Sequence, residues 1–229
     1  MKNKLLIFLT ITFFVLGANA QNTCSKYYPT KKGTAFQMKV YDKKDNLSTT
    51  IDYSILDSKT TGSNQTATIE ALTRDDKDKL ITTVNYDISC DGDKLSIDFN
   101  SLINPQIYEQ YKDMEIEVSG TNIELPNKLS IGQNLPDADV LMNIKVTPIN
   151  MKLSVVISNR KVEAKETITT PAGTFECFVI SYEMDLKMGF KQNMMAKDWI
   201  SEGIGLVQSQ SFNKNGKQMS RTILTQFSK

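Results

Sequence analysis

The feature that most constrains the fold is an alternation of apolar and polar residues, repeated in short segments along the 229-residue chain. Phe36, Met38 and Val40 face one side of the first segment, while Gln37 and Lys39 face the other, which is the pattern of a half-buried β-strand. We expect strands at 36–40, 47–55, 67–71, 80–90, 95–99, 115–118, 138–146, 151–157, 194–200, 206–212 and 218–227. With turn-forming residues between them, these segments predict an all-β fold, a curled antiparallel sheet or half-barrel of roughly 11–13 strands.

The stretch 166–186 predicts a hairpin at the centre of this sheet. Residues 171–173, Pro-Ala-Gly, interrupt two β-rich arms, because proline presets a turn and glycine tolerates a positive φ. The second arm carries apolar residues on both faces, with Cys177 and Val179 on one and Ile180 with its aromatic neighbours on the other. A strand that is apolar on both faces lies inside a fold.

Two segments depart from the strand pattern. Residues 104–112 begin with Asn-Pro and place apolar side chains on one side, which predicts one short helix. The stretch 125–137 is loop-like, with two prolines and a glycine. We interpret it as a connection between two halves of the sheet; a lid or rim is the alternative.

The first twenty residues have the pattern of a secretory signal peptide. Lys2 and Lys4 precede a short apolar run at 5–16, and residues 18–20, Ala-Asn-Ala, are the small residues that signal peptidase requires. The run is shorter than the roughly 20 residues of a membrane span. We predict a signal peptide at residues 1–20, a single β domain at 21–229 and a periplasmic or secreted protein; a buried N-terminal helix is the alternative.

Charge excludes some classes of partner. The chain has a net charge of +1, which becomes about −1 once the two lysines of the predicted signal peptide are removed. A chain without net positive charge has no bulk attraction for nucleic acid or an anionic membrane. We therefore expect no nucleic-acid partner, and no later stretch approaches the length of a transmembrane segment.

The three cysteines are informative in an oxidising compartment. Cys24 lies near the predicted mature N-terminus and Cys90 ends a predicted strand, so we predict a disulfide between them; three free thiols are the alternative. Closing so long a loop stabilises the fold by about 4 kcal/mol in the chain-entropy model. Cys177 is interpreted as a small buried hydrophobe. Residues 21–23 lack the pattern of a lipobox, so we expect no lipid anchor at Cys24.

Several motifs occur in a fixed order along the chain. They are Cys-Ser-Lys-Tyr-Tyr-Pro from residue 24, Ser89-Cys90, Glu-Thr-Ile-Thr-Thr-Pro-Ala-Gly-Thr-Phe-Glu-Cys from 166, Trp199, Gly-Ile-Gly-Leu-Val from 203, and Ser-Phe-Asn-Lys-Asn-Gly-Lys from 211. In this order the chain resembles a family of exported bacterial β proteins catalogued as a domain of unknown function and sometimes called TapB-like. The resemblance implies a curled antiparallel sheet, similar to the half-barrels of lipoprotein carriers, and export. It implies no activity.

The sequence shows no catalytic machinery. It contains no histidine, which excludes Ser-His-Asp and Cys-His arrangements and every His-containing metal site. It also lacks a glycine-rich phosphate loop, and the acidic turn at 75–79 lacks the spacing of a calcium loop. A pair of glycosidase-like carboxylates stays open, because nothing marks one pair out. We expect no catalytic residue, cofactor or metal, and hence no enzyme.

Methionine is concentrated in the middle and second half of the chain. Flexible Met side chains can line a pocket for a lipid or another apolar ligand, or can fill an irregular core. The candidate lining residues are Met142, Met151, Met184, Met188, Phe190, Met194 and Met195.

Two functions are therefore considered. The first is an exported, non-enzymatic binding module that holds an apolar small molecule on the concave face of the sheet. The second is a structural or protein-interaction component of the cell envelope that has no small-molecule pocket.

Overall fold

The structure is a computed structural model that describes residues 24–103, 105–111, 113–146 and 149–229. The predicted signal peptide and both ends of the predicted helical segment, Asn104 and Lys112, lie outside the described residues. The strands are β1 (Ala35–Asp42), β2 (Leu47–Thr61), β3 (Asn64–Asp75), β4 (Leu80–Cys90), β5 (Lys94–Ile97), β6 (Glu115–Thr121), β7 (Ile123–Pro126), β8 (Ala138–Val146), β9 (Ile149–Thr170), β10 (Gly173–Met188), β11 (Phe190–Ser201), β12 (Gly205–Asn213) and β13 (Gln218–Ser228).

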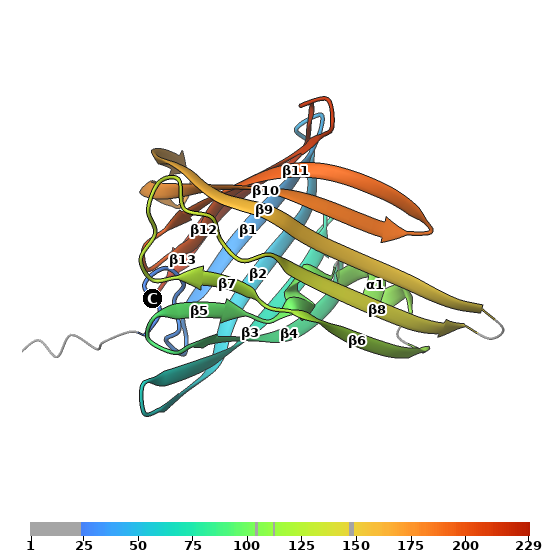
Figure 1. The fold of residues 1–229 in the computed structure, drawn as a ribbon, viewed down its shortest axis with the longest axis horizontal. Helices are drawn as coiled ribbons and strands as arrows, with labels where there is room; N and C mark the ends of the chain where they lie inside the picture. The colour runs from blue at the N-terminus through green and yellow to red at the C-terminus, as the bar shows by residue number, and fades with distance from the viewer. Residues whose placement is uncertain (1–23, 104, 112, 147–148) are drawn as a thin grey trace, which may run out of the picture.

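The described residues form a 13-stranded sheet in the order β6-β8-β9-β10-β11-β12-β13-β1-β2-β3-β4-β5-β7. Most neighbours in the sheet are consecutive in the chain and antiparallel, as a meander predicts. The edge strands β6 and β7 are separated in sequence only by Asn122, so the sheet curls into a nearly closed barrel (Figure 1). The predicted all-β class, curled sheet and strand number are confirmed.

The central hairpin consists of β9 and β10, which are joined at Pro171 and Ala172. Gly173 follows with φ of 141°, a value that side-chain-bearing residues rarely adopt. Beta-bulges interrupt the pairing of these strands at two places, between Val179 and Ile180 and between Ser181 and Glu183. Bulges bend a strand and increase its twist, which is how two such long strands follow the curve of the barrel.

Two short helical elements interrupt the chain after β5. The 3-10 helix η1 (Phe99–Leu102) begins where the Asp98 side chain accepts a hydrogen bond from the backbone N–H of Asn100. The predicted strand 95–99 was therefore too long, because this cap ends β5 at Ile97. The predicted short helix is present as α1 (Pro105–Gln110). None of the helices among the described residues is long and apolar enough to cross a bilayer.

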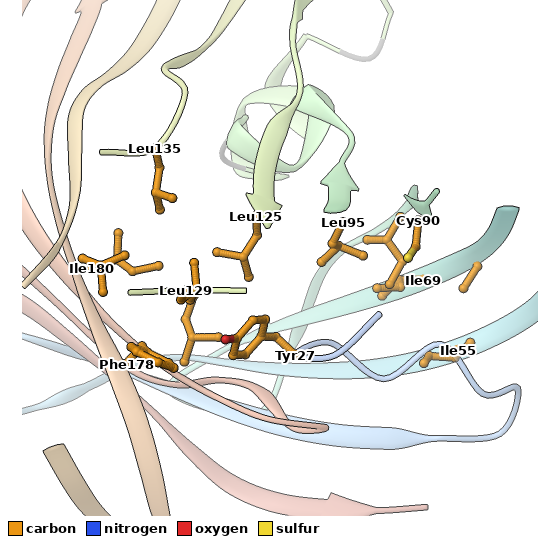
Figure 2. Close-up of a cluster of buried hydrophobic side chains, with 14 residues drawn as sticks. Tyr27, Ile55, Ile69, Cys90, Leu95, Leu125, Leu129, Leu135, Phe178 and Ile180 are labelled. Atoms are coloured by element: carbon orange, nitrogen blue, oxygen red, sulfur yellow. The ribbon is translucent and has the colours of Figure 1, made fainter. Parts of the chain in front are cut away.

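One end of the barrel, which we call the closed end, is filled by apolar side chains. We name them the closed-end core: Tyr27, Ile55, Ala67, Ile69, Ile88, Cys90, Leu95, Leu125, Leu129, Leu135, Val162, Phe178, Ile180 and Ile200. Figure 2 shows Tyr27 beside Leu129 and Phe178, with Leu125 and Leu95 directed into the same space. Tyr27 and Leu129 belong to no strand, so segments outside the sheet complete this core.

Covalent and polar contacts hold the N-terminal segment in place at the closed end. Cys24 and Cys90 form a disulfide with a Cα–Cα distance of 5.8 Å. The Asn127 side chain donates hydrogen bonds to the carbonyl oxygens of Cys24 at 2.7 Å and Gly92 at 2.9 Å, and it accepts one from the backbone N–H of Lys26 at 2.9 Å. One residue therefore joins the N-terminal segment, the β4–β5 turn and the loop after β7.

The loop after β7 continues the sheet rather than covering it. Backbone hydrogen bonds run from Gly132 N to Val162 O, from Leu135 N to Arg160 O and from Val162 N to Gln133 O. The loop thus lies along β9, next to β8. This geometry agrees with a connection between the two halves of the sheet.

A smaller cluster packs on the opposite face of the central hairpin. Cys177, Val179, Trp199 and Val207 are buried there, so β10 is apolar on both faces as predicted. The indole Nε1 of Trp199 donates a 2.7 Å hydrogen bond to Glu166 Oε2, which joins two of the sequence motifs. Cys177 is buried and free, and burial raises its pKa to about 11, which suits a packing role.

Candidate functional site

A ring of polar side chains lies inside the barrel, next to the closed-end core. We call it the polar belt; it comprises Tyr28, Tyr53, Tyr86, Arg160, Tyr182 and Asp198. The last five each lie two positions along a strand from a member of the closed-end core. These pairs are Tyr53 and Ile55, Tyr86 and Ile88, Arg160 and Val162, Tyr182 and Ile180, and Asp198 and Ile200. Residues i and i+2 of a strand share one face, so the belt and the core face the same interior.

The interior changes character beyond the belt. On β3, Ile69 of the closed-end core is followed on the same face by Ala71 and then Thr73. Ala71 is too small to fill the space that isoleucine fills one step earlier. A pocket of about 460 Å³ opens beside these residues, between β1–β4 and η1. The exposed Ser48 lies on its lining, and we call this side of the barrel the open end.

Arg160 is directed inward by an irregularity in β9. Asn159 has a positive φ of 54°, and the pairing with β10 slips by one residue opposite Tyr182. Bulges commonly re-aim a side chain in this way. The Arg160 side chain is buried, and its Nη1 donates to the carbonyl oxygens of Glu124 at 3.0 Å and Pro136 at 2.6 Å. It thus satisfies a carbonyl group of edge strand β7 and holds the two sides of the sheet together.

Asp198 is the carboxylate of the belt. The Tyr182 hydroxyl donates to Asp198 Oδ1 at 3.3 Å, and Ser209 also donates to this carboxylate. Burial raises the pKa of Asp198 to about 6, although these two hydrogen bonds and the positive charge of Arg160 act in the opposite direction. Burial likewise lowers the pKa of Arg160, while Asp198 counteracts it. Both shifts follow from removing charges from water.

The remaining tyrosines extend the belt across the interior. Burial raises the pKa of Tyr53 to about 12 and also raises the pKa values of Tyr28 and Tyr86. Tyr28 is held by close packing on Gly205, where an added Cβ would lie 2.9 Å from the ring. Gly205 also has φ of 88°, so both space and backbone favour glycine there. The first and fifth sequence motifs meet at this contact.

Two cavities adjoin the belt. Tyr53 and Tyr86 line the 460 Å³ pocket, with Val40, Ile51, Val84 and Ile103 among its apolar walls. Tyr28, Arg160, Tyr182 and Asp198 line a smaller cavity of about 130 Å³. Leu102 of η1 contributes to both linings, so the two spaces are neighbours.

The structure brings together some of the predicted lining residues. Met142, Met151, Met184 and Met188 belong to an apolar cluster built on β8, β9, β10 and the segment 99–111. Of these, Met184 also lines the 130 Å³ cavity.

The other predicted lining residues are not members of this cluster, although Met194 pairs with Met184 and Phe190 with Met188 across β10 and β11. Phe190 is 67% exposed beside the turn between β10 and β11, and Met194 is half-buried on β11. Met195 is 42% exposed and lines a pocket of about 480 Å³ on the opposite face of the sheet, with Glu163 and Lys197. The 2.8 Å ion pair between these two residues occupies part of that surface.

Sequence reasoning missed the polar belt. Tyr53, Tyr86 and Tyr182 lie in predicted strands, but no role was assigned to their hydroxyl groups. A signal was available for Asp198, which lies two positions before Ile200 on a predicted strand. Arg160 gave no such signal, because the alternation at 151–157 places residue 160 on the outer face and only the irregularity at Asn159 turns it inward. A charged residue at an inward position of a strand indicates either a partner or a site.

The arrangement offers hydrogen-bond donors and acceptors inside an apolar wall. The described residues contain no group of three or more acidic, cysteine or histidine side chains placed to hold a metal ion. Arg160 and Asp198 are two ionisable groups on the lining of one cavity. A few polar groups on a mainly apolar wall suit recognition of a polar group by hydrogen bonds.

Comparison with known proteins places the chain in a family. A family model described as DUF3108-like matches residues 31–224. The chain belongs to the DUF3108-like family. The predicted resemblance to an uncharacterised family of exported β proteins is thereby confirmed, and the match includes every member of the polar belt except Tyr28. The description of this family names no activity.

Two solved structures share the fold. One is a protein of Bacteroides fragilis described as exported and as having a YmcC-like fold, with a TM-score of 0.76 and 18% identity. The other is described as a lipoprotein of Parabacteroides distasonis, with a TM-score of 0.76 and 21% identity. Each alignment covers 90% of this chain and 100% of the other. No curated protein matches the sequence.

Proposed function

We propose that this member of the DUF3108-like family is an exported, non-enzymatic binding module that holds an apolar small molecule inside its curled sheet. The observation that carries this proposal is the 460 Å³ pocket at the open end, whose size falls within the range of ligand sites. Small side chains such as Ala71 leave this space where larger ones would fill it.

The construction of the barrel supports the same function. The closed end is packed with apolar side chains and cross-linked by the Cys24–Cys90 disulfide, so the fold does not depend on filling the pocket. A rigid, preformed site binds with a smaller loss of conformational entropy than one that must be ordered. Concave, mainly apolar pockets with a few polar groups are the usual form of small-molecule sites.

The alternative, an envelope component that acts through protein contacts, is favoured by one observation. Phe190 and Met195 are large apolar residues exposed on or beside the outer face of β10 and β11. Exposed single hydrophobic residues are common on soluble proteins, so this observation is weaker than the pocket.

The test is displacement of a fluorescent fatty acid from the purified protein. Ala71→Leu and Val84→Phe each place extra side-chain volume in the pocket, and we expect each to weaken binding at least about tenfold. Thr83→Leu adds an apolar side chain at an exposed position beside Val84 and serves as the matched control with unchanged binding. Circular dichroism on each variant verifies that it is folded.

Saturable binding that both pocket variants weaken supports the proposal. If the wild-type protein binds neither the fluorescent fatty acid nor an uncharged ester of the same chain saturably, the proposal is overturned and the envelope component is the better explanation. Binding that Thr83→Leu weakens as much as Ala71→Leu also overturns it, because the fluorophore then binds the outer surface.

A further inference from the structure

The charges inside the barrel balance. Arg160 and Asp198 are the charged members of the polar belt, with opposite signs, and they line the same 130 Å³ cavity. Burial disfavours the charged form of each. A ligand carboxylate placed here would meet the negative charge of Asp198, and a ligand ammonium group would meet the positive charge of Arg160. In a poorly solvated site, either added charge is unfavourable unless it is paired.

The belt also offers hydrogen-bonding groups that protein atoms do not use. Among the described residues, the buried Thr73 Oγ1, in a side chain that is 3% exposed, has no hydrogen-bond partner, and Tyr28, Tyr53 and Tyr86 add further hydroxyl groups to the linings of the two cavities. Thr73 lines the larger pocket together with two of these tyrosines. A hydroxyl group both donates and accepts, so alcohol groups on a ligand would match this set of partners.

The two cavities differ in size and in lining, and they suit different parts of a ligand. The 130 Å³ cavity at Asp198 has room for a small polar group, since a water molecule occupies about 30 Å³ of liquid. The larger pocket has apolar walls from Val40, Ile51, Val84 and Leu102. Leu102 lies on both linings, so the two spaces are neighbours.

These observations deepen the proposed function and rest on it. We propose that the ligand is a neutral amphiphile, a hydrocarbon chain joined to an uncharged polyol head as in a monoacylglycerol. The head groups bind the tyrosine hydroxyls and the Arg160–Asp198 pair, and the chain lies along the apolar walls of the larger pocket.

The experiment compares three ligands that share one chain length and differ in head charge. Monolaurin, laurate and dodecylammonium are titrated into the wild-type protein by calorimetry at pH 7.5, below their aggregation concentrations. We expect monolaurin to bind at least about tenfold more tightly than either charged ligand, because only its head adds no net charge to the belt.

Asp198→Asn tests the cause of the preference. It removes the negative charge and keeps an acceptor for Tyr182 and Ser209, so the charge of Arg160 becomes unbalanced. We expect the ratio of the laurate affinity to the monolaurin affinity to rise about tenfold. Asp185→Asn removes the same charge from a strand position that pairs with Lys191 at 3.0 Å, outside the linings of both cavities. This control should alter neither affinity.

The outcomes separate the inference from the proposed function. If laurate or dodecylammonium binds the wild-type protein as tightly as monolaurin, the neutral-head inference is wrong and the binding function stands. The same conclusion follows if none of the three binds although the fluorescent fatty acid does. If neither the dodecyl ligands nor the fluorescent fatty acid binds, the proposed function fails as well.

Discussion

The closed and open ends of this barrel use the same strands for opposite purposes. At the closed end, β2, β3 and β4 contribute Ile55, Ile69 and Ile88 to a packed core. Two positions further along the same faces, they contribute Tyr53, Ala71 and Tyr86 to the lining of a pocket. On each strand, the interior changes from a packed core to a pocket lining between one inward-facing residue and the next.

The difference shows how a barrel of this size can keep an internal space. Empty volume lowers stability because the lining atoms lose contacts. The closed end offsets this loss with a buried core, a disulfide and the three hydrogen bonds of Asn127. We therefore expect stability to be concentrated at one end and binding at the other.

Removing the disulfide should have the largest effect on this division. The double variant Cys24→Ala/Cys90→Ala loses a cross-link between residues 66 positions apart, and we expect the free energy of unfolding to fall by about 4 kcal/mol. Urea denaturation measures it, and Cys177→Ala, which removes the free buried cysteine, is the control with a smaller loss. An equal loss in the two variants would show that the cross-link does not hold the closed end.

Truncation of one side chain at each end sharpens the comparison. Leu95→Ala removes a closed-end side chain with 0% exposure, and we expect it to lower the free energy of unfolding by about 3 kcal/mol. Val84→Ala truncates a half-buried pocket wall, with an expected loss of about 1 kcal/mol or less. Similar losses at the two sites, measured by urea denaturation, would contradict the assignment of stability to the closed end.

The carboxyl group of Asp198 should make stability fall as pH rises. Its folded pKa of about 6 lies above the ordinary aspartate value of 3.8, so between about pH 4 and 6 the folded state keeps a proton that the unfolded state has lost. The free energy of unfolding therefore decreases across this window, by about 2–3 kcal/mol from this group alone, and stays lower above it. Asp198→Asn should remove this part of the pH dependence in thermal melts, while Asp185→Asn retains it. Identical pH profiles for the wild-type protein and Asp198→Asn would show that this carboxyl group is not buried.

Much of the fold could be predicted because its signals are local. Alternation along strands such as Phe36 to Val40, and turn residues such as Pro171 and Ala172, act over a few positions, and each was interpreted correctly. The predicted end of β5 was two residues too late. The Asp98 side chain caps the following 3-10 helix by accepting a hydrogen bond from the backbone N–H of Asn100, and such local side-chain bonds compete with strand formation. The disulfide prediction used position and compartment alone, and the structure forms the same pair.

The site was harder to predict because its members come from five strands and the N-terminal segment. Nothing near Tyr28 in the sequence indicates Asp198, and nothing near either indicates that Ala71 borders a space. The methionine content identified an apolar wall on β8–β10. Whether a cavity lies beside that wall depends on the size of the side chains that face it from other strands, and those side chains are distant in the sequence.

The sequence by itself determined that this chain forms an antiparallel sheet with one face turned inward, because side-chain direction in a strand depends only on position. The tertiary structure decided where that inward face is packed and where it is hollow. Pairing of β9 and β11 on either side of β10 brings Arg160 and Asp198 to one cavity, and the curl of the sheet leaves the space beside Ala71 unfilled. Those relations depend on distances between strands, which local residue preferences do not specify.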